Sequence, residues 1–210
     1  MSIGIFVPPV ADTWQLVQRA EQLGYGRAWL YDTPMLNSEL FTSLTACAMK
    51  TTKIRLASGV MIPSNRIASV AASGLATLNA LAPGRIDWGL STGFTGRRTL
   101  GLKPVKLADL EEYVRVVRGL LAGETLEWNF EEKRRKIRFL DPGIGAINID
   151  DPIPLHISAF GPKARALVAK LGAGWIDAPH GMEHARHNIA DMRKAWTAAG
   201  RDIKDLDRKS

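Results

Sequence analysis

Cysteine is almost absent from this chain of 210 residues, in which Cys47 is the single one. One cysteine cannot form an internal disulfide or a thiolate metal cluster, which fits a reducing cytosol. The sequence also lacks any uninterrupted apolar run near the ~20 residues that a membrane span needs. Its start, MSIGIFVPPVAD, lacks the basic segment and long apolar segment of a signal peptide. These absences predict a soluble cytoplasmic protein without a membrane partner.

Several catalytic and binding motifs are also missing, namely a P-loop, a zinc motif and a Ser-His-Asp arrangement. His184 and His187 lie three residues apart in a charged segment without a carboxylate pair, which favours a solvated helix face over a metal site. The net charge of +7 favours anionic ligands, but a phosphate-bearing cofactor explains it as well as nucleic acid does. The basic cluster at 131–135 (EEKRR) has no aromatic platform, so we predict a solvated turn and no nucleic-acid partner.

Strand and helix patterns alternate along most of the chain. Short apolar runs predict strands at 2–8, 27–32, 54–63, 85–91, 152–160 and 174–179, and amphipathic spacing predicts helices at 13–23, 39–50, 67–81, 107–122, 163–171 and 183–199. Repeated βα units imply a parallel sheet with helices outside. Two short strands, 125–130 and 136–140, interrupt this order and predict a hairpin inserted at 124–141. We expect one domain over residues 1–210.

The stretch 53–96 joins the third and fourth predicted strands. Ser58-Gly59 lies inside the third strand, where glycine weakens the ladder unless a bulge or a close ligand requires it. The fourth strand ends in LSTGFTG, which is polar and flexible where a barrel strand opens into its active-site loop. An ordinary βαβ unit explains this stretch equally well, so both interpretations stay open here.

An anion site is predicted where the fifth strand meets the next helix. The run Ser158-Ala159-Phe160-Gly161-Pro162 passes from a strand end to a helix N-terminus, where free amides and the helix dipole attract an anion. His180 and Gly181 follow the sixth strand in the same way and can add a second wall. Plain helix capping is the alternative. His156, within the fifth strand, reads as a hydrogen-bonded core histidine.

Four segments resemble the bacterial luciferase-like oxidoreductases, which comprise FMN-dependent monooxygenases and coenzyme F420-dependent reductases and dehydrogenases. They are ASGV at 57–60, LNALAPGRIDWGLSTG at 78–93, LLAGE at 120–124 and ISAFGPKARALVAKLGAGWIDAP at 157–179. The resemblance covers essentially the whole chain. It implies a (β/α)8 TIM barrel with an insertion after the fourth strand, and a homodimer.

The resemblance also implies roles for single residues. Ser58, Gly59 and Val60 would form a bulge with a cis Gly59–Val60 peptide that backs the cofactor ring. Asp32 would contact the ring or the substrate, with a solvated turn as the alternative, and Thr92 and Gly93 would lie beside the ring. The F420 dehydrogenases often carry an acid just after this point, whereas this chain has Phe94.

The number of βα units departs from the family pattern, because we count six where the barrel needs eight. The chain therefore reads as a C-terminally incomplete barrel with exposed sheet edges, expected to pack against a second copy through helices 39–50 and 67–81. The expected function is oxidation of a small organic substrate with reduced FMN and O2, or hydride transfer with F420. No catalytic residue is assigned. The alternative is a catalytically inactive cofactor-binding or partner-binding fragment of such a barrel.

Overall fold

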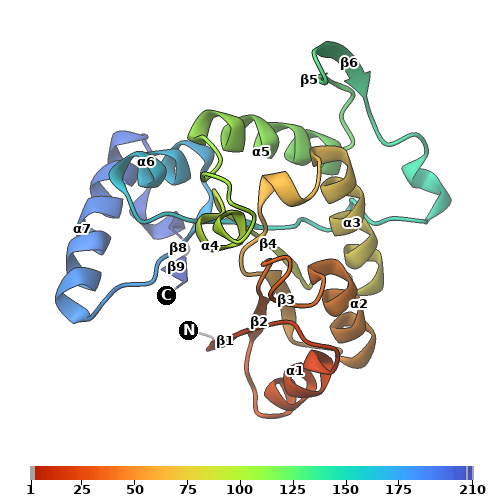
Figure 1. The fold of residues 1–210 in the computed structure, drawn as a ribbon, viewed down its shortest axis with the longest axis horizontal. Helices are drawn as coiled ribbons and strands as arrows, with labels where there is room; N and C mark the ends of the chain where they lie inside the picture. Colours follow the sequence, from red (N-terminus) through yellow and green to blue (C-terminus); the bar gives the residue numbers. More distant parts are fainter. Residues whose placement is uncertain (1–2, 207, 210) are drawn as a thin grey trace.

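The core of the fold is a curled parallel sheet, seen in a computed structural model that describes residues 3–206 and 208–209 (Figure 1). Its strand order is β1-β2-β3-β4-β7-β8-β9, and each neighbouring pair is parallel. The strands are β1 (Gly4–Val7), β2 (Arg27–Leu30), β3 (Arg55–Ser58), β4 (Ile86–Leu90), β7 (Leu155–Ser158), β8 (Gly174–Ile176) and the short β9 (Arg208–Lys209). The six predicted βα units are therefore present and form a half-barrel. β9 adds one strand that the sequence pattern did not predict.

Helices cover the outer side of this sheet (Figure 1). The long ones lie within two residues of their predicted bounds: α1 (Thr13–Gln22), α2 (Leu40–Lys50), α3 (Ala68–Leu81), α5 (Leu107–Leu121), α6 (Pro162–Leu171) and α7 (Met182–Ala198). The short α4 (Phe94–Arg98) was not predicted, because five residues carry no amphipathic repeat. The described residues also form three short 3-10 helices: η1 (Pro63–Asn65), η2 (Pro142–Ile144) and η3 (Ile203–Asp205). No helix in the described part of the chain is long and apolar enough to cross a membrane.

The third strand is shorter than predicted because the chain leaves the ladder at Gly59. The Gly59–Val60 peptide is cis, which confirms the prediction for this bond. Gly59 N donates to Leu30 O at 2.6 Å, and Met61 N donates to Gly89 O at 2.8 Å, so pairing resumes on the other side of the bulge. The predicted bulge at residues 58–60 is thus present.

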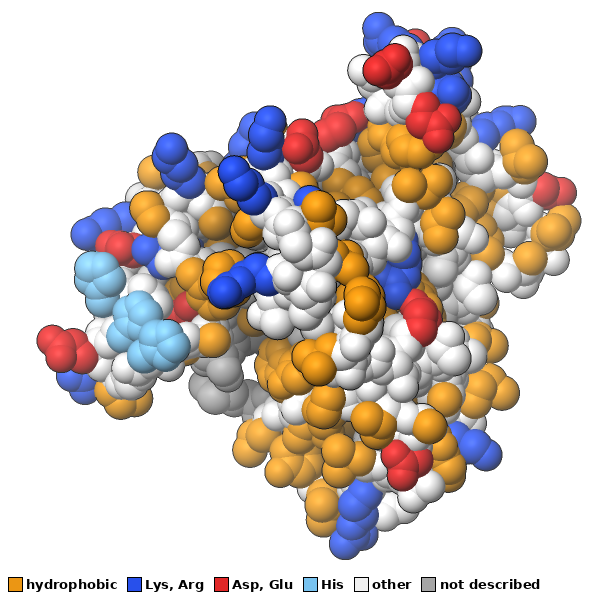
Figure 2. All heavy atoms as spheres, in the orientation of Figure 1, with side chains coloured by type: hydrophobic (Ala, Val, Ile, Leu, Met, Phe, Trp, Pro, Cys, Tyr) orange, Lys and Arg blue, Asp and Glu red, His pale blue; other side chains and the backbone are white. Residues whose placement is uncertain are grey.

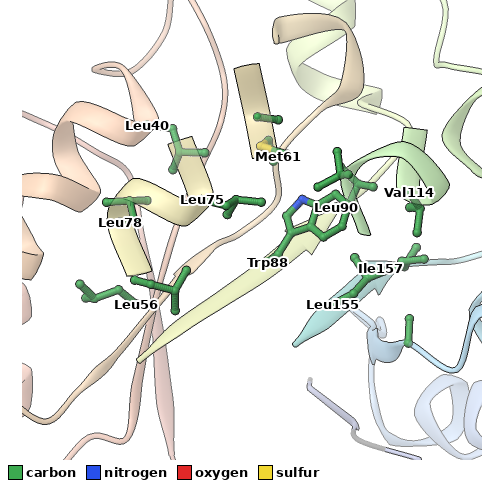
Figure 3. Packing of buried hydrophobic residues seen from close by; sticks show 14 of the residues in the cluster. Leu40, Leu56, Met61, Leu75, Leu78, Trp88, Leu90, Val114, Leu155 and Ile157 are labelled. Atoms are coloured by element: carbon green, nitrogen blue, oxygen red, sulfur yellow. The ribbon is translucent and has the colours of Figure 1, made fainter. Parts of the chain in front are cut away.

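The two faces of the sheet carry different residues, because successive side chains of a strand point to opposite sides. The outer face packs against the helices in one apolar core, part of which is drawn in Figure 3 (Leu56, Trp88, Leu90, Leu155 and Ile157). The concave face carries a smaller cluster of Trp29, Ala57 and Ile176. Phe6 stacks on Trp29 with ring centroids 5.5 Å apart and remains 41% exposed. The inside of the half-barrel therefore carries an apolar cluster that is partly open to solvent.

A polar layer lies beside this cluster, centred on the buried carboxylate of Asp87. Arg27 Nε and Arg55 Nε approach Asp87 Oδ2 at 2.6 and 2.8 Å. His156 is also buried, and its Nε2 lies 3.4 Å from Asp87 Oδ1, which confirms the prediction of a hydrogen-bonded core histidine. Burial would raise the pKa of Asp87, but hydrogen bonds from His156 and Arg55 and the charge of Arg27 hold that pKa well below its usual range.

Two antiparallel strands follow α5 and interrupt the alternation of parallel strands and helices. They are β5 (Leu126–Phe130) and β6 (Lys133–Ile137), and they project from the body of the molecule (Figure 1). The second strand begins three residues earlier than predicted. Glu131 and Glu132 form the turn alone, with φ values of 50° and 59°, as two-residue hairpin turns require. The three basic residues assigned to the turn, 133–135, therefore belong to β6. The description of this pair as an insertion into a barrel stays a prediction.

Candidate functional site

A cleft of about 720 Å³ opens where the carboxyl ends of β1, β2, β3, β4 and β7 meet. In a parallel barrel these strand ends share one rim, which brings the following loops together. The lining residues are Pro8, Val10, Tyr31, Asp32, Thr33, Leu36, Asn37, Gly59, Val60, Ile62, Ser91, Gly93, Phe94, Thr95, Gly96, Ser158 and Phe160. An adjoining hollow of about 540 Å³ shares Ser91, Phe94, Ser158 and Phe160 and extends to Thr92 and Gly161. The structure therefore places most of the predicted site residues on one surface.

The bulge contributes Gly59 and Val60 to the cleft, whereas Ser58 lies behind it. The Ser58 side chain is buried, donates to Gly89 O at 2.8 Å and accepts from Gly89 N at 2.9 Å. A Cβ added to Gly89 would lie 2.1 Å from Ser58 O, so the two strands need glycine at this point. Ser58 thus ties β3 to β4 and does not face the cleft, contrary to its predicted contact with a cofactor.

Asp32 lines the cleft, but its carboxylate is already engaged. Its Oδ2 accepts hydrogen bonds from Ile62 N (3.2 Å), Asn65 Nδ2 (3.0 Å) and Arg66 Nη1 (2.9 Å), and the residue is 5% exposed. Arg66 also pairs with Glu39. Burial would lower the pKa of Arg66, but these two carboxylates hold that pKa above its usual value. Asp32 therefore ties β2 to the segment after β3, and the alternative of a solvated turn is wrong.

The loop after β4 reaches the rim through Gly93 and Phe94. Gly93 has φ of 83° and precedes α4, and an added Cβ would lie 2.6 Å from Ile62 Cγ2. This position needs glycine both for its left-handed backbone and for the close approach. Thr92 lines the adjoining hollow, and Phe94 lines both spaces while remaining 61% exposed. Thr92 and Gly93 therefore lie at the rim, and their place beside a cofactor ring stays a prediction.

The turn from β7 to α6 carries the residues that were predicted to bind an anion, and that role stays a prediction. Gly161 is exposed at the N-terminal end of α6, with Pro162 at the first helical position, and an added Cβ would meet no atom within 4 Å. Ser158 lines both spaces. Ala159 lines neither, because it is buried with its N–H bonded to Ile176 O and its carbonyl to Trp175 Nε1. Gly161 thus leaves room beside the amides of the helix N-terminus.

The second wall predicted at His180 and Gly181 is not brought to the cleft. Neither residue lines either space. His180 is exposed, and its backbone N–H donates to His184 Nδ1 at 3.1 Å. Gly181 has φ of 104° and precedes α7, so its conformation serves the helix start. In the described residues no three His, Cys, Asp or Glu side chains form a group that could hold a metal ion.

Several residues that form the walls of the cleft were not predicted from the sequence. These are mainly apolar or aromatic loop residues, namely Val10, Tyr31, Leu36 and Phe160. Single exposed apolar residues are common on protein surfaces, so the sequence offered no signal that they converge. Their position at or just after the ends of predicted strands was the one available clue.

A sequence model of the luciferase-like monooxygenase family matches residues 3–209. The chain belongs to this family. It is 33% identical over 215 residues to the 5,10-methylenetetrahydromethanopterin reductase of Methanolobus tindarius. The aligned region covers 99% of this chain and 63% of that relative. It is 31% identical over 141 residues to the F420-dependent glucose-6-phosphate dehydrogenase of Beutenbergia cavernae, covering 63% of this chain and 40% of the relative. These matches confirm the resemblance drawn from the sequence.

Solved structures of the same fold agree. The coenzyme F420-dependent tetrahydromethanopterin reductase of Methanopyrus kandleri superimposes with a TM-score of 0.82 at 22% identity, over 99% of this chain and 64% of that one. A type II Baeyer-Villiger monooxygenase of Pseudomonas putida in complex with FMN gives a TM-score of 0.80 at 12% identity, over 99% and 66%. At these identities the likeness shows the fold alone. The luciferase-like chain spans about 63% of the length of the reductase relative from Methanolobus tindarius.

Proposed function

We propose that this luciferase-like chain belongs to an oxidoreductase that binds F420 or FMN in the cleft at the strand ends and acts on a small organic substrate. The observation that carries the proposal is the joining of two spaces at one rim, with the bulge on one side and the open N-terminus of α6 on the other. The alternative of an inactive binding fragment is not favoured, because the relatives named above are enzymes.

The residues present fit such a cofactor. Both cofactors carry a flat ring system and a phosphate-bearing chain, which require a long cleft with an anion site at one end. Gly59 and Val60 line the cleft where the ring would lie, and Gly161 leaves open space beside the N-terminus of α6 where a phosphate can approach. When bound, F420 would supply hydride exchange and reduced FMN would supply oxygen activation.

The relatives favour F420, since the dehydrogenase at 31% identity is named as F420-dependent. FMN remains a second candidate because Phe94 stands where F420 dehydrogenases often carry an acid, and this side chain lines the cleft. In either case the role of the chain is to bind the ring, orient it against the apolar walls and keep water away from the reacting side.

Direct binding tests this proposal. The purified protein is titrated with F420 and, separately, with reduced and oxidised FMN, and binding is followed by cofactor fluorescence. We expect at least one cofactor to bind, and we expect Gly161→Val to weaken that cofactor about tenfold or more, because the side chain fills the phosphate approach. The matched control is Gly143→Val in η2, whose added Cβ makes an ordinary 3.6 Å contact with Asp141 and lies outside both spaces.

Two outcomes would contradict the proposal at different points. Failure of every cofactor to bind removes the oxidoreductase function. If the wild type and Gly161→Val bind the cofactor equally well, the phosphate binds elsewhere. The proposed function is then supported only by the surface that Gly59 and Val60 offer to the ring.

We also propose that the chain forms a homodimer through α2 and α3. Exposed apolar side chains on these helices support this assembly, with Met49 65% and Val70 53% exposed. β1 and β9 stand at the two ends of the sheet order, so the described sheet is not closed within one chain. Sedimentation at micromolar concentration should give a dimer that Val70→Lys weakens, whereas a compact monomer would refute it.

A further inference from the structure

The walls of the cleft point to the chemical class of the substrate. We propose that the cleft takes an uncharged substrate with an apolar body and one hydroxyl or carbonyl group. This inference rests on the oxidoreductase function proposed above, and it names what that site would accept.

Four exposed apolar side chains, each from a segment that follows a different strand, line the cleft. Val10 follows β1, Leu36 follows β2, Phe94 follows β4 and Phe160 follows β7, and they are 51%, 68%, 61% and 58% exposed. Exposed apolar groups that converge in a concave site mark a ligand surface more reliably than the same groups scattered singly. Figure 2 shows hydrophobic side chains gathered on the part of the surface that carries β1 and α1. An apolar substrate body would cover the four apolar side chains that line the cleft.

Positive charge is missing from the same walls. Among the described residues that line the cleft and the adjoining hollow, none is Lys, Arg or His. Arg66 is near, but Asp32 and Glu39 both pair with it, which leaves two carboxylates against one guanidinium. Arg98 stacks on the Phe94 ring at 5.1 Å and is not a lining residue. An anionic substrate would therefore meet apolar surface and no cationic side chain on these walls.

Neutral hydrogen-bonding groups complete the site. Tyr31, Ser91 and Ser158 offer hydroxyls to the cleft, and Asn37 offers an amide. These groups can donate to a carbonyl oxygen or accept from a hydroxyl without any net charge. This pattern differs from what a sugar phosphate needs, because the N-terminus of α6 is assigned to the cofactor phosphate and the walls hold no arginine or lysine for a second phosphate. The glucose 6-phosphate in the name of one relative is therefore a poor match for these walls.

A pair of probes with the same skeleton tests the inference. The binding of 2-phenylethanol and of its phosphate monoester is measured by saturation-transfer NMR, first with the protein alone and then with the cofactor that binds. We expect the alcohol to bind about tenfold or more tightly than the ester, because the ester brings a charge that the cleft does not neutralise. Tighter binding of the ester, or binding of neither probe, would overturn the inference.

A charge substitution locates the effect in the cleft. Leu36→Lys places a cation on the apolar wall at a side chain that is already 68% exposed, so folding should tolerate it. We expect this variant to bind the ester at least several-fold more tightly and the alcohol less tightly. Leu140→Lys is the matched control, because Leu140 is 86% exposed and lies outside both spaces. Equal behaviour of the two variants would show that the probes bind elsewhere and would overturn the assignment of the cleft.

The cofactor titration separates this inference from the proposed function. If a cofactor binds and the ester is preferred, the substrate class is wrong while the function stands. If no cofactor binds but the alcohol is preferred and Leu36→Lys reverses that preference, the cleft has the proposed ligand class and the oxidoreductase function is wrong.

Discussion

Replacing Asp87 by asparagine should destabilise the protein more than any change in an exposed ion pair. The Asp87 side chain is fully buried and receives Arg27, Arg55 and His156 at 2.6, 2.8 and 3.4 Å. Asparagine keeps the shape but removes the charge, so two guanidinium groups lose their buried counter-charge. Breaking a buried ion pair by removing one partner costs about 3–5 kcal/mol. Because the Arg27 and Arg55 side chains are 12% and 30% exposed, water reaches them partly, and we expect about 3 kcal/mol.

The pH dependence of the free energy of unfolding is a second test of the Asp87→Asn substitution. The pKa of Asp87 is lower in the folded protein than the unfolded value of about 3.9, so its ionised form stabilises the fold above that value. This contribution is lost as the pH falls through the unfolded value toward the lower folded one. The wild type should therefore lose stability below about pH 5, and Asp87→Asn should show a flatter acid limb.

Urea denaturation, monitored by circular dichroism at several pH values, measures both the loss of stability and its pH dependence. Glu112→Gln is the control, because it breaks a pair with Arg115 in which both side chains are about half exposed, and it should cost less than about 1 kcal/mol. A loss for Asp87→Asn no larger than that of the control would refute the reasoning. An unchanged acid limb would likewise show that the buried cluster does not hold the Asp87 charge.

Three further changes test other parts of the fold. Gly89→Ala should cost about 3 kcal/mol in urea denaturation, because its Cβ would lie 2.1 Å from Ser58 O, and a cost below about 1 kcal/mol would contradict this contact. Cys47 is buried, and burial raises the pKa of its thiol to about 12, so a thiol reagent should label it only in denaturant; fast labelling of the native protein would contradict this placement. The Glu21 carboxylate accepts three backbone N–H groups of residues 52–54 at 2.6–2.9 Å, so Glu21→Gln should lower the free energy of unfolding by about 1 kcal/mol. An unchanged denaturation midpoint for Glu21→Gln would show that these bonds add nothing over water.

The sequence alone specified the order of the βα units and the bounds of the long helices. Both depend on local patterns, namely helical spacing of apolar residues and short apolar runs between turn residues. It also predicted residues that meet at one rim, because parallel strands deliver their carboxyl ends to the same edge whatever their exact register. The cis peptide at Gly59–Val60 was predicted from the family resemblance, not from periodicity, and the structure has it.

The tertiary structure decided which predicted residues face the cleft. Asp32 meets Arg66, which lies 34 residues further along the chain, and His180 lies beside its own helix instead of the rim. The apolar side chains on which the substrate inference rests come from four segments far apart in the sequence, and none of them stands out when taken singly. Such contacts depend on how strands align and how helices pack, and these are set by many distant residues together. A local pattern cannot encode them, so only the folded chain shows which side chains share the site.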